Sequence, residues 1–184
     1  MARTESTMLP LGTSDPEFAL NDVTTHQRWT IQSASGPEGL LVMFICRHCP
    51  FVKHLQSALA QLGRDYQGKG IGIVAISSND VLAYPDDAPN SLAEQARGVG
   101  FTFPYLYDET QQVARAYNAV CTPDFFLFDG NHKLVYRGQF DASRPGNDIP
   151  ITGQDLRAAL DALLADQPIN PDQRPSLGCN IKWK

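Results

Sequence analysis

The sequence predicts an α/β fold in which helices flank a central mixed β-sheet. Two apolar runs, at residues 39–45 and 71–76, have the length and composition of strands that are buried on both faces of a sheet. The segment between them, residues 51–62, carries apolar residues at helical spacing. Further along, two apolar segments meet at a Gly-Asn turn that is typical of an antiparallel hairpin. A parallel unit followed by a hairpin makes the sheet mixed.

The first unit is predicted to be a strand, a helix and a second strand. A right-handed crossover through the helix would place the two strands parallel. Gly63 and Gly68 are expected to end the helix, because glycine is common just past a helix C-terminus. The stripe that would pack this helix against the sheet consists of Phe51, Leu55, Leu59 and Leu62.

Two short helices are expected after the second strand. Ser91 and Glu94 have the spacing of a capping box, which predicts a helix from residue 91 to about Gly100. Another helix is expected to follow Asp108. The order of elements then continues into the hairpin.

The hairpin is predicted from strands at 124–129 and 133–139 around the turn at residues 130–131. Additional strands are expected near the N-terminus, at residues 18–22 and 29–32. They would extend the sheet beyond the β-α-β unit and the hairpin.

A final helix is expected to begin near Thr152 and Asp155, which are suitable capping residues. The tail, residues 167–184, is rich in proline and polar residues and is predicted to be irregular. Trp183 gives that tail an apolar side chain, so we expect the tail to dock onto the domain. The apolar face of the final helix consists of Leu156, Leu160 and Leu163.

The size and charge of the chain limit the possible functions. Its 184 residues are expected to form one domain, residues 1–184, with a core at about 16–166. The net charge of −5 and the lack of basic runs argue against a nucleic-acid or anionic-membrane partner. The N-terminal region lacks the apolar stretch of a secretory signal, and no apolar run is long enough to cross a bilayer. We therefore expect a cytoplasmic protein that does not contact the membrane.

The motif Cys46-Arg47-His48-Cys49 indicates thiol chemistry at the end of the first buried strand. A cysteine at a helix N-terminus has a lowered pKa, and we expect Cys46 to be the attacking thiolate. Arg47 and His48 are expected to stabilise that thiolate, and His48 is also the nearest candidate proton acceptor. Cys49, three residues later, is placed to resolve a mixed disulfide. No cofactor is needed for this exchange.

Alternatives to redox chemistry remain open for the four cysteines. Two buried structural thiols would explain the close pair less well than catalysis does. A zinc site is not expected, because Cys121 and Cys179 are isolated from each other in sequence. Cys121 is either a small buried apolar residue or an additional redox thiol, and Cys179 is a possible third redox thiol.

With this motif and order of elements, the chain resembles the thioredoxin superfamily and, within it, the peroxiredoxin-like redoxins of AhpC/TSA type. The resemblance covers about residues 18–164 and implies a thioredoxin fold and thiol-disulfide oxidoreductase activity. It also implies that Thr122-Pro123 forms a cis-proline loop beside Cys46. Thr122 would then offer a backbone edge to a protein or small-molecule disulfide partner.

The chain departs from the family patterns at several positions, which leaves two other functions open. A peroxidase motif would place proline at Val42 and threonine or serine at Cys46, with Cys49 as the peroxidatic residue. Leu40 stands where thioredoxin has a buried aspartate. A thiol-dependent peroxidase is the first alternative. A Cu(I)-binding chaperone is the second, because thiolates beside a histidine suit Cu(I), although Sco-type chaperones of this fold use CxxxC spacing.

Overall fold

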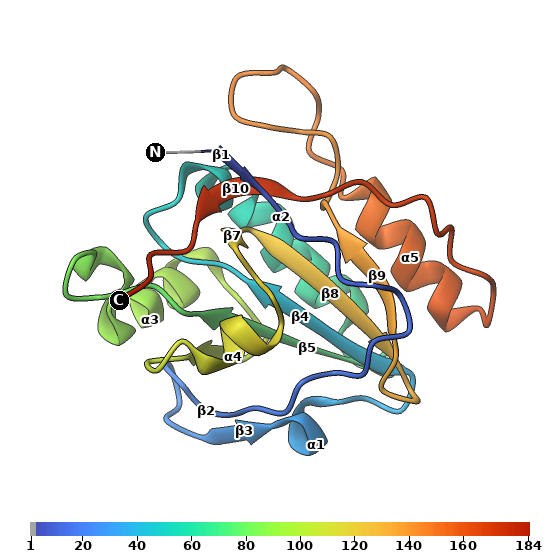
Figure 1. Cartoon of the computed structure of the whole chain (residues 1–184), viewed down its shortest axis with the longest axis horizontal. Helices are drawn as coiled ribbons and strands as arrows, with labels where there is room; N and C mark the ends of the chain where they lie inside the picture. The colour runs from blue at the N-terminus through green and yellow to red at the C-terminus, as the bar shows by residue number, and fades with distance from the viewer. Residues whose placement is uncertain (1–2) are drawn as a thin grey trace.

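The computed structural model describes residues 3–184. Within that range the chain forms one sheet of seven strands in the order β3-β2-β6-β5-β4-β8-β9 and one of three strands in the order β1-β10-β7 (Figure 1). The strands of the large sheet are β2 (Ala19–Asp22), β3 (Arg28–Thr30), β4 (Gly39–Phe44), β5 (Ile71–Ser77), β6 (Tyr105–Tyr107), β8 (Asp124–Asp129) and β9 (Leu134–Gly138). The small sheet consists of β1 (Arg3–Glu5), β7 (Cys121–Thr122) and β10 (Leu177–Asn180).

The large sheet is mixed, as the sequence predicts. β4 pairs in parallel with β5, and β5 pairs in parallel with β6. β4 also pairs antiparallel with β8, and β8 pairs antiparallel with β9, which is the predicted hairpin. β4, the strand that leads into the cysteine motif, therefore joins the β-α-β unit to the hairpin through its pairing with β8.

Helices cover both faces of this sheet because the residues of β4 alternate between two cores. Leu41 and Met43 face the core formed with α2 (Pro50–Tyr66), α3 (Pro89–Val99) and α5 (Gln154–Leu164). Leu40 and Val42 face the core that includes α1 (Ile31–Ala34) and α4 (Gln112–Ala116). A 3₁₀ turn, η1 (Pro85–Asp87), precedes α3.

The helix after β4 continues past Gly63, the first of the two glycines predicted to end it. α2 continues through Gly63 and ends at Tyr66. A Cβ atom at position 63 would lie 2.8 Å from the ring of Phe103, so the glycine permits close packing inside the helix. The prediction is wrong for Gly63, because a packing requirement resembles a C-cap signal in the sequence. It holds for Gly68, which directly follows the C-cap residue Gln67 and has a φ of +78°.

The predicted caps of two other helices are also wrong. α3 begins at Pro89, which places Ser91 inside its first turn rather than at the N-cap. The N-cap of α5 is Gly153 rather than Thr152 or Asp155. Asp141 accepts hydrogen bonds from the backbone N–H groups of Thr152 and Gly153 at 2.8 and 2.6 Å, so a distant carboxylate satisfies the start of α5.

The C-terminal tail is ordered at its end, in contrast to the prediction. β10 pairs antiparallel with β1 on one side and with β7 on the other. Figure 1 shows these three strands together near the N-terminal end of α2. The tail docks as expected, but its buried anchors include Cys179 and Ile181, while Trp183 is partly exposed and lies against Arg115. No helix among residues 3–184 has the length and apolar character needed to cross a membrane.

Candidate active site

The cysteine motif forms the turn between β4 and α2. Ile45 follows the strand, and α2 begins at Pro50 with Cys49 as its N-cap. Cys46 therefore lies before the helix rather than at its N-terminus. The start of the helix is displaced because proline, which lacks an N–H, occupies the first helical position.

The electrostatic environment favours thiolate at Cys49 rather than at Cys46, which corrects the prediction. Burial raises the pKa of the Cys46 thiol, and its hydrogen bond to Cys49 and the negative charge of Asp87 raise it further. Hydrogen bonds from the thiols of Cys179 and Cys46 lower the pKa of Cys49, and the backbone N–H of Val52 adds to this effect. Both sulfur atoms are fully buried.

Arg47 does not stabilise the Cys46 thiolate as predicted, because its side chain is held by α3. Its guanidinium donates hydrogen bonds to the carbonyl of Ser91 at 2.8 Å and to the carboxylate of Glu94 at 2.9 Å. The two residues expected to form a capping box thus bind Arg47. They fix the motif loop to the neighbouring helix.

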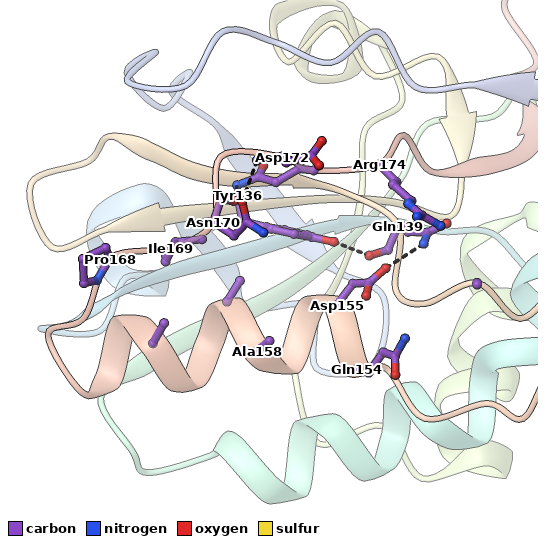
Figure 2. Close-up of a pocket in the computed structure, with 14 residues that line it drawn as sticks. Tyr136, Gln139, Gln154, Asp155, Ala158, Pro168, Ile169, Asn170, Asp172 and Arg174 are labelled. Carbon is purple, nitrogen blue, oxygen red and sulfur yellow. Dashed lines mark hydrogen bonds between the residues drawn. The ribbon is translucent and has the colours of Figure 1, made fainter.

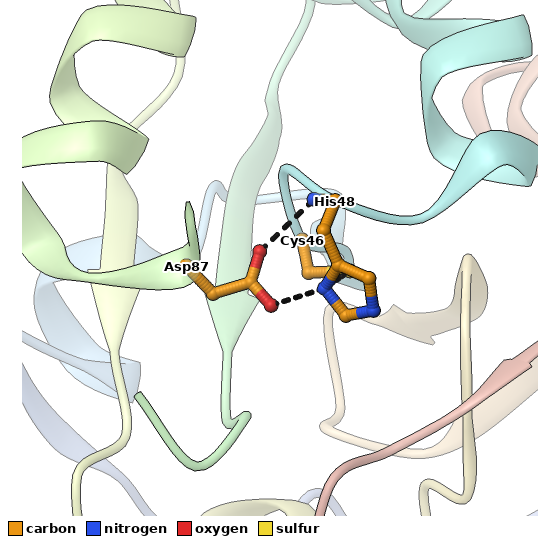
Figure 3. Close-up of side chains that lie close together, drawn as sticks. All are labelled: Cys46, His48 and Asp87. Atoms are coloured by element: carbon orange, nitrogen blue, oxygen red, sulfur yellow. Dashed lines mark hydrogen bonds and ion pairs between the residues drawn. The ribbon is translucent and has the colours of Figure 1, made fainter. Parts of the chain in front are cut away.

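His48 is close to Cys46, as expected for a candidate proton acceptor. Its Nδ1 atom lies 3.8 Å from Sγ of Cys46 and 2.5 Å from Oδ2 of Asp87 (Figure 3). The ring also stacks on Tyr84, with the centroids 5.1 Å apart. Among the described residues, its Nε2 atom is buried and has no hydrogen-bond partner. The short contact orients the ring through Asp87.

Asp87 is a site residue that the sequence analysis missed, because the Tyr-Pro-Asp-Asp segment resembles a solvated turn. In the structure Asp87 is fully buried, and its Oδ1 atom accepts hydrogen bonds from the backbone N–H groups of Arg47 and His48 at 2.8 and 3.0 Å. Despite burial, hydrogen bonds from His48 and Asn79 lower the pKa of this carboxyl group. One signal was available: Asp87 follows β5, and residues after neighbouring parallel strands meet at the same edge of a sheet.

Asn79 connects Asp87 to the C-terminal tail. Its amide donates to Oδ2 of Asp87 at 2.8 Å, and its side-chain oxygen accepts from the backbone N–H of Lys182, also at 2.8 Å. The motif loop, the segment after β5 and the tail therefore share one hydrogen-bond network.

The Thr122-Pro123 peptide bond is cis, and the loop faces both motif cysteines. The Thr122 hydroxyl lies 3.3 Å from Sγ of Cys46, and the Thr122 carbonyl oxygen lies 3.2 Å from Sγ of Cys49. The expected docking edge is not open, because β10 pairs with β7 along it. The chain's own tail occupies the position at which a partner strand was expected.

The other two cysteines differ in their relation to the motif. Cys179 is opposite Thr122 in the β10-β7 register, and its sulfur atom lies 2.9 Å from Sγ of Cys49. Cys121 is adjacent to Thr122 on β7, so its side chain points to the other face of that strand. Its sulfur lies 3.8 Å from the Pro123 carbonyl oxygen, and burial raises its pKa. The structure thus brings Cys179, and not Cys121, against the motif.

Comparison with other proteins shows to which family the chain belongs. The family model described as AhpC/TSA family matches residues 11–137, which include the cysteine motif and the cis-proline loop. The chain belongs to the AhpC/TSA family.

Relatives of this AhpC/TSA-family chain include two proteins named thiol-disulfide oxidoreductase ResA. The one from Geobacillus kaustophilus (strain HTA426) is 28% identical over 131 residues, which cover 71% of this chain and 70% of the relative. The one from Geobacillus thermodenitrificans (strain NG80-2) has the same identity and coverage.

Solved structures confirm the thioredoxin fold. An uncharacterized conserved protein from Geobacillus kaustophilus is 52% identical, with a TM-score of 0.98 and coverage of 100% of this chain and 97% of that one. A hypothetical protein from Sinorhizobium meliloti 1021 is 46% identical, with a TM-score of 0.96 and 98% coverage of both chains. A thiol:disulfide interchange protein from Chlorobium tepidum TLS shares the fold at 16% identity, with a TM-score of 0.64 and coverage of 84% and 98%.

In this AhpC/TSA-family chain, Cys46, His48 and Asp87 have the spacing of metal ligands. One ligand atom from each lies within 4.8 Å of the others. However, both Asp87 oxygens accept hydrogen bonds from the protein, and Nδ1 of His48 contacts Asp87 directly. The carboxylate is also a poor match for Cu(I), which prefers thiolate and thioether ligands. This arrangement fits a hydrogen-bonded triad better than a metal centre.

A pocket of about 520 Å³ lies elsewhere on the molecule, between α5, β9 and the tail (Figure 2). It is crossed by a hydrogen bond of 2.6 Å from Gln139 to Asp155, and Tyr136 and Arg174 also line it. None of the four cysteines is among its lining residues. The thiol site is therefore separate from this pocket.

Proposed function

We propose that this protein is a thiol-disulfide oxidoreductase that exchanges a disulfide with a protein or small-molecule partner through Cys46 and Cys49. One observation carries the proposal: both motif thiols meet Thr122 of the cis-proline loop, at 3.3 and 3.2 Å. The names of the two ResA relatives support the same chemistry. Nδ1 of His48 donates to Asp87, so beside Cys46 this atom is a hydrogen-bond donor rather than an acceptor of the thiol proton.

The exchange consists of two thiolate substitutions. One motif thiolate attacks a partner disulfide, which forms a mixed disulfide and releases one partner thiolate. The second motif thiol then loses its proton and attacks the sulfur of the first. The Cys46–Cys49 disulfide forms, the second partner thiolate leaves, and the partner has gained two electrons from the pair.

The environment of the pair favours Cys49 as the attacking sulfur, whereas the sequence favours Cys46. Cysteine variants decide between them. If Cys49 attacks, the double variant Cys46→Ala/Cys179→Ala, which leaves no thiol next to Cys49, accumulates a mixed disulfide with a small disulfide probe and Cys49→Ala does not. The opposite pattern would establish Cys46 as the nucleophile.

The proposal is tested by the reduction potential of the pair in glutathione buffers together with reduction of insulin disulfides. We expect a reversible two-electron couple and insulin turnover, both of which Cys49→Ala abolishes and Cys121→Ala retains. A wild-type protein without a reversible couple would contradict the proposal, as would one that consumes peroxide but does not exchange disulfides.

Peroxide reduction at Cys49 is a second candidate, favoured by the hydrogen bonds that lower the pKa of this cysteine. The thiolate would attack a peroxide oxygen, form a sulfenic acid and release water or an alcohol. Hydrogen peroxide consumption by the wild type, retained in Cys46→Ala and lost in Cys49→Ala, would support this activity. Absence of peroxide consumption would exclude it.

A further inference from the structure

A third cysteine from the far end of the chain lies against the motif. Sγ of Cys179 is 2.9 Å from Sγ of Cys49, although the two residues are 130 positions apart in sequence. Both side chains are buried, and β10 is held on two sides by β1 and β7. The register places Cys179 opposite Thr122, the residue that contacts both motif cysteines. The contact is therefore imposed by strand pairing.

We propose that Cys179 is a second resolving cysteine, so that Cys49 is shared between two alternative disulfides, Cys46–Cys49 and Cys49–Cys179. This inference rests on the proposed function, because the oxidised motif supplies the disulfide that Cys179 attacks. It assigns a redox role to the C-terminal strand.

The step is an internal disulfide exchange. The Cys179 thiolate attacks Sγ of Cys49, the Cys49–Cys179 bond forms, and the Cys46–Cys49 bond breaks. Cys46 leaves as a thiolate and takes up one proton, which balances the proton lost by Cys179, and no electrons enter or leave. A disulfide bond is about 2.05 Å long, so the two sulfur atoms need to approach by less than about 1 Å.

The charges around the three thiols support this direction. In the reduced protein, the hydrogen bond to Cys49 raises the pKa of Cys179, and burial and the charge of Cys49 raise it further, while Lys182 lowers it. Oxidation of Cys49 removes the hydrogen bond to its thiolate and its negative charge, both of which raise the pKa of Cys179. Burial still raises that pKa, and the charge of Lys182 still lowers it. Cys46 remains buried and close to Asp87, so it favours the neutral thiol that the step produces.

The second disulfide would also fasten the tail. A Cys49–Cys179 bond joins β10 to the N-cap of α2, which keeps the tail paired along the cis-proline loop. At the same time it returns Cys46 to the thiol form. The disulfide first formed within the motif would thus be held between the motif and the tail, while β10 stays paired with the edge of β7.

Mapping of the disulfides in the full-length protein tests the inference. The protein is oxidised with diamide, its remaining thiols are blocked with N-ethylmaleimide, and it is digested with trypsin without reduction. Cleavage after Arg47 separates Cys46 from Cys49, so each disulfide gives a distinct linked peptide in the mass spectrum. We expect both linkages in the wild type and in the control Cys121→Ala.

The variants separate this inference from the proposed function. Cys46→Ala should form an intramolecular Cys49–Cys179 bond with a reversible couple in glutathione buffers, and Cys46→Ala/Cys179→Ala should lose both. If the wild type contains only Cys46–Cys49 and Cys46→Ala gives only glutathionylated or intermolecular Cys49, the inference is overturned while the proposed function stands. If the wild type forms no Cys46–Cys49 bond and does not exchange disulfides, both fail. Should Cys46→Ala not fold, the wild-type map decides.

Discussion

At the scale of single residues, Asp87 organises the site. One carboxylate oxygen binds two backbone N–H groups of the motif loop, and the other binds His48 and Asn79. The same negative charge raises the pKa of Cys46, after the larger effects of burial and the hydrogen bond to Cys49. Asp87 therefore holds the loop in place and disfavours ionisation of Cys46.

Replacement of Asp87 by asparagine should lower the pKa of Cys46. The amide retains an oxygen acceptor of similar size and removes the negative charge. Carbon NMR of isotopically labelled cysteine Cβ atoms, followed across pH, measures the ionisation of Cys46. The control is Asp86→Asn, which changes an exposed neighbouring carboxylate. A Cys46 pKa that is unchanged or raised in Asp87→Asn would contradict this account.

Asp87 should also make stability depend on pH in the acid range. Burial opposes its ionisation, but hydrogen bonds from His48 and Asn79 lower its pKa below the usual value of about 3.9. The stabilisation is complete above that unfolded-state pKa and is lost as the pH falls through the lower folded-state pKa. The free energy of unfolding of the wild type should exceed that of Asp87→Asn by about 1–3 kcal/mol at pH 7.

This difference should shrink as the pH falls below about 3.9. Urea unfolding of wild type, Asp87→Asn and Asp86→Asn at a series of pH values measures it. A difference between wild type and Asp87→Asn that stays constant down to acid pH would argue against an ionised, hydrogen-bonded Asp87.

At the scale of secondary structure, β10 lies against the cis-proline loop and the motif. It lies between β1 and β7 in a sheet beside the start of α2, and the two motif sulfur atoms beneath it are buried. Its close approach to the cis-proline loop depends on Gly178. A Cβ atom at that position would lie 1.9 Å from the backbone oxygen of Thr122.

Gly178→Ala should therefore weaken the docking of β10 and expose Cys49. We expect alkylation of Cys49 by iodoacetamide to become at least about tenfold faster, which corresponds to about 1.4 kcal/mol of lost docking free energy. Mass spectrometry of the alkylated peptide measures the rate. Gly98→Ala, at a position in α3 with open space around its Cβ, is the control. Equal alkylation rates in the wild type and Gly178→Ala would show that β10 does not limit access.

At the scale of the whole molecule, the two disulfides proposed for Cys49 would close loops of very different length. A Cys46–Cys49 bond closes only the motif turn, whereas a Cys49–Cys179 bond spans 130 positions and encloses most of the large sheet. A crosslink removes more conformational entropy from the unfolded chain when it closes a longer loop. The two oxidised forms should therefore differ in stability.

Oxidation should stabilise Cys46→Ala more than Cys179→Ala, because only the former can form the long-range bond. The chain-entropy relation gives an increase in the free energy of unfolding of about 5 kcal/mol for the long loop and about 2 kcal/mol for the short one. Denaturant unfolding of each variant with and without reductant measures both increases. A smaller gain in Cys46→Ala than in Cys179→Ala would contradict the assignment of Cys179.

The strands and the long helix around the motif were determined by the sequence itself. Their apolar runs and helical periodicity are local signals, and residues 39–45 and 71–76 became β4 and β5 with small changes at their ends. The motif Cys46-Arg47-His48-Cys49 and the loop at Thr122-Pro123 were also recognisable, because their spacing and position carry the family resemblance.

Contacts between distant segments were decided only by the tertiary structure. Asp87 became part of the site because β5 ends beside β4, and Cys179 because β10 pairs with β7 in one register. Helix starts were mispredicted where Asp141 or a proline replaced a local cap. The pKa values of Cys46 and Cys49 depend on burial and on charges brought from other segments, so spacing within the motif does not determine which sulfur is the thiolate.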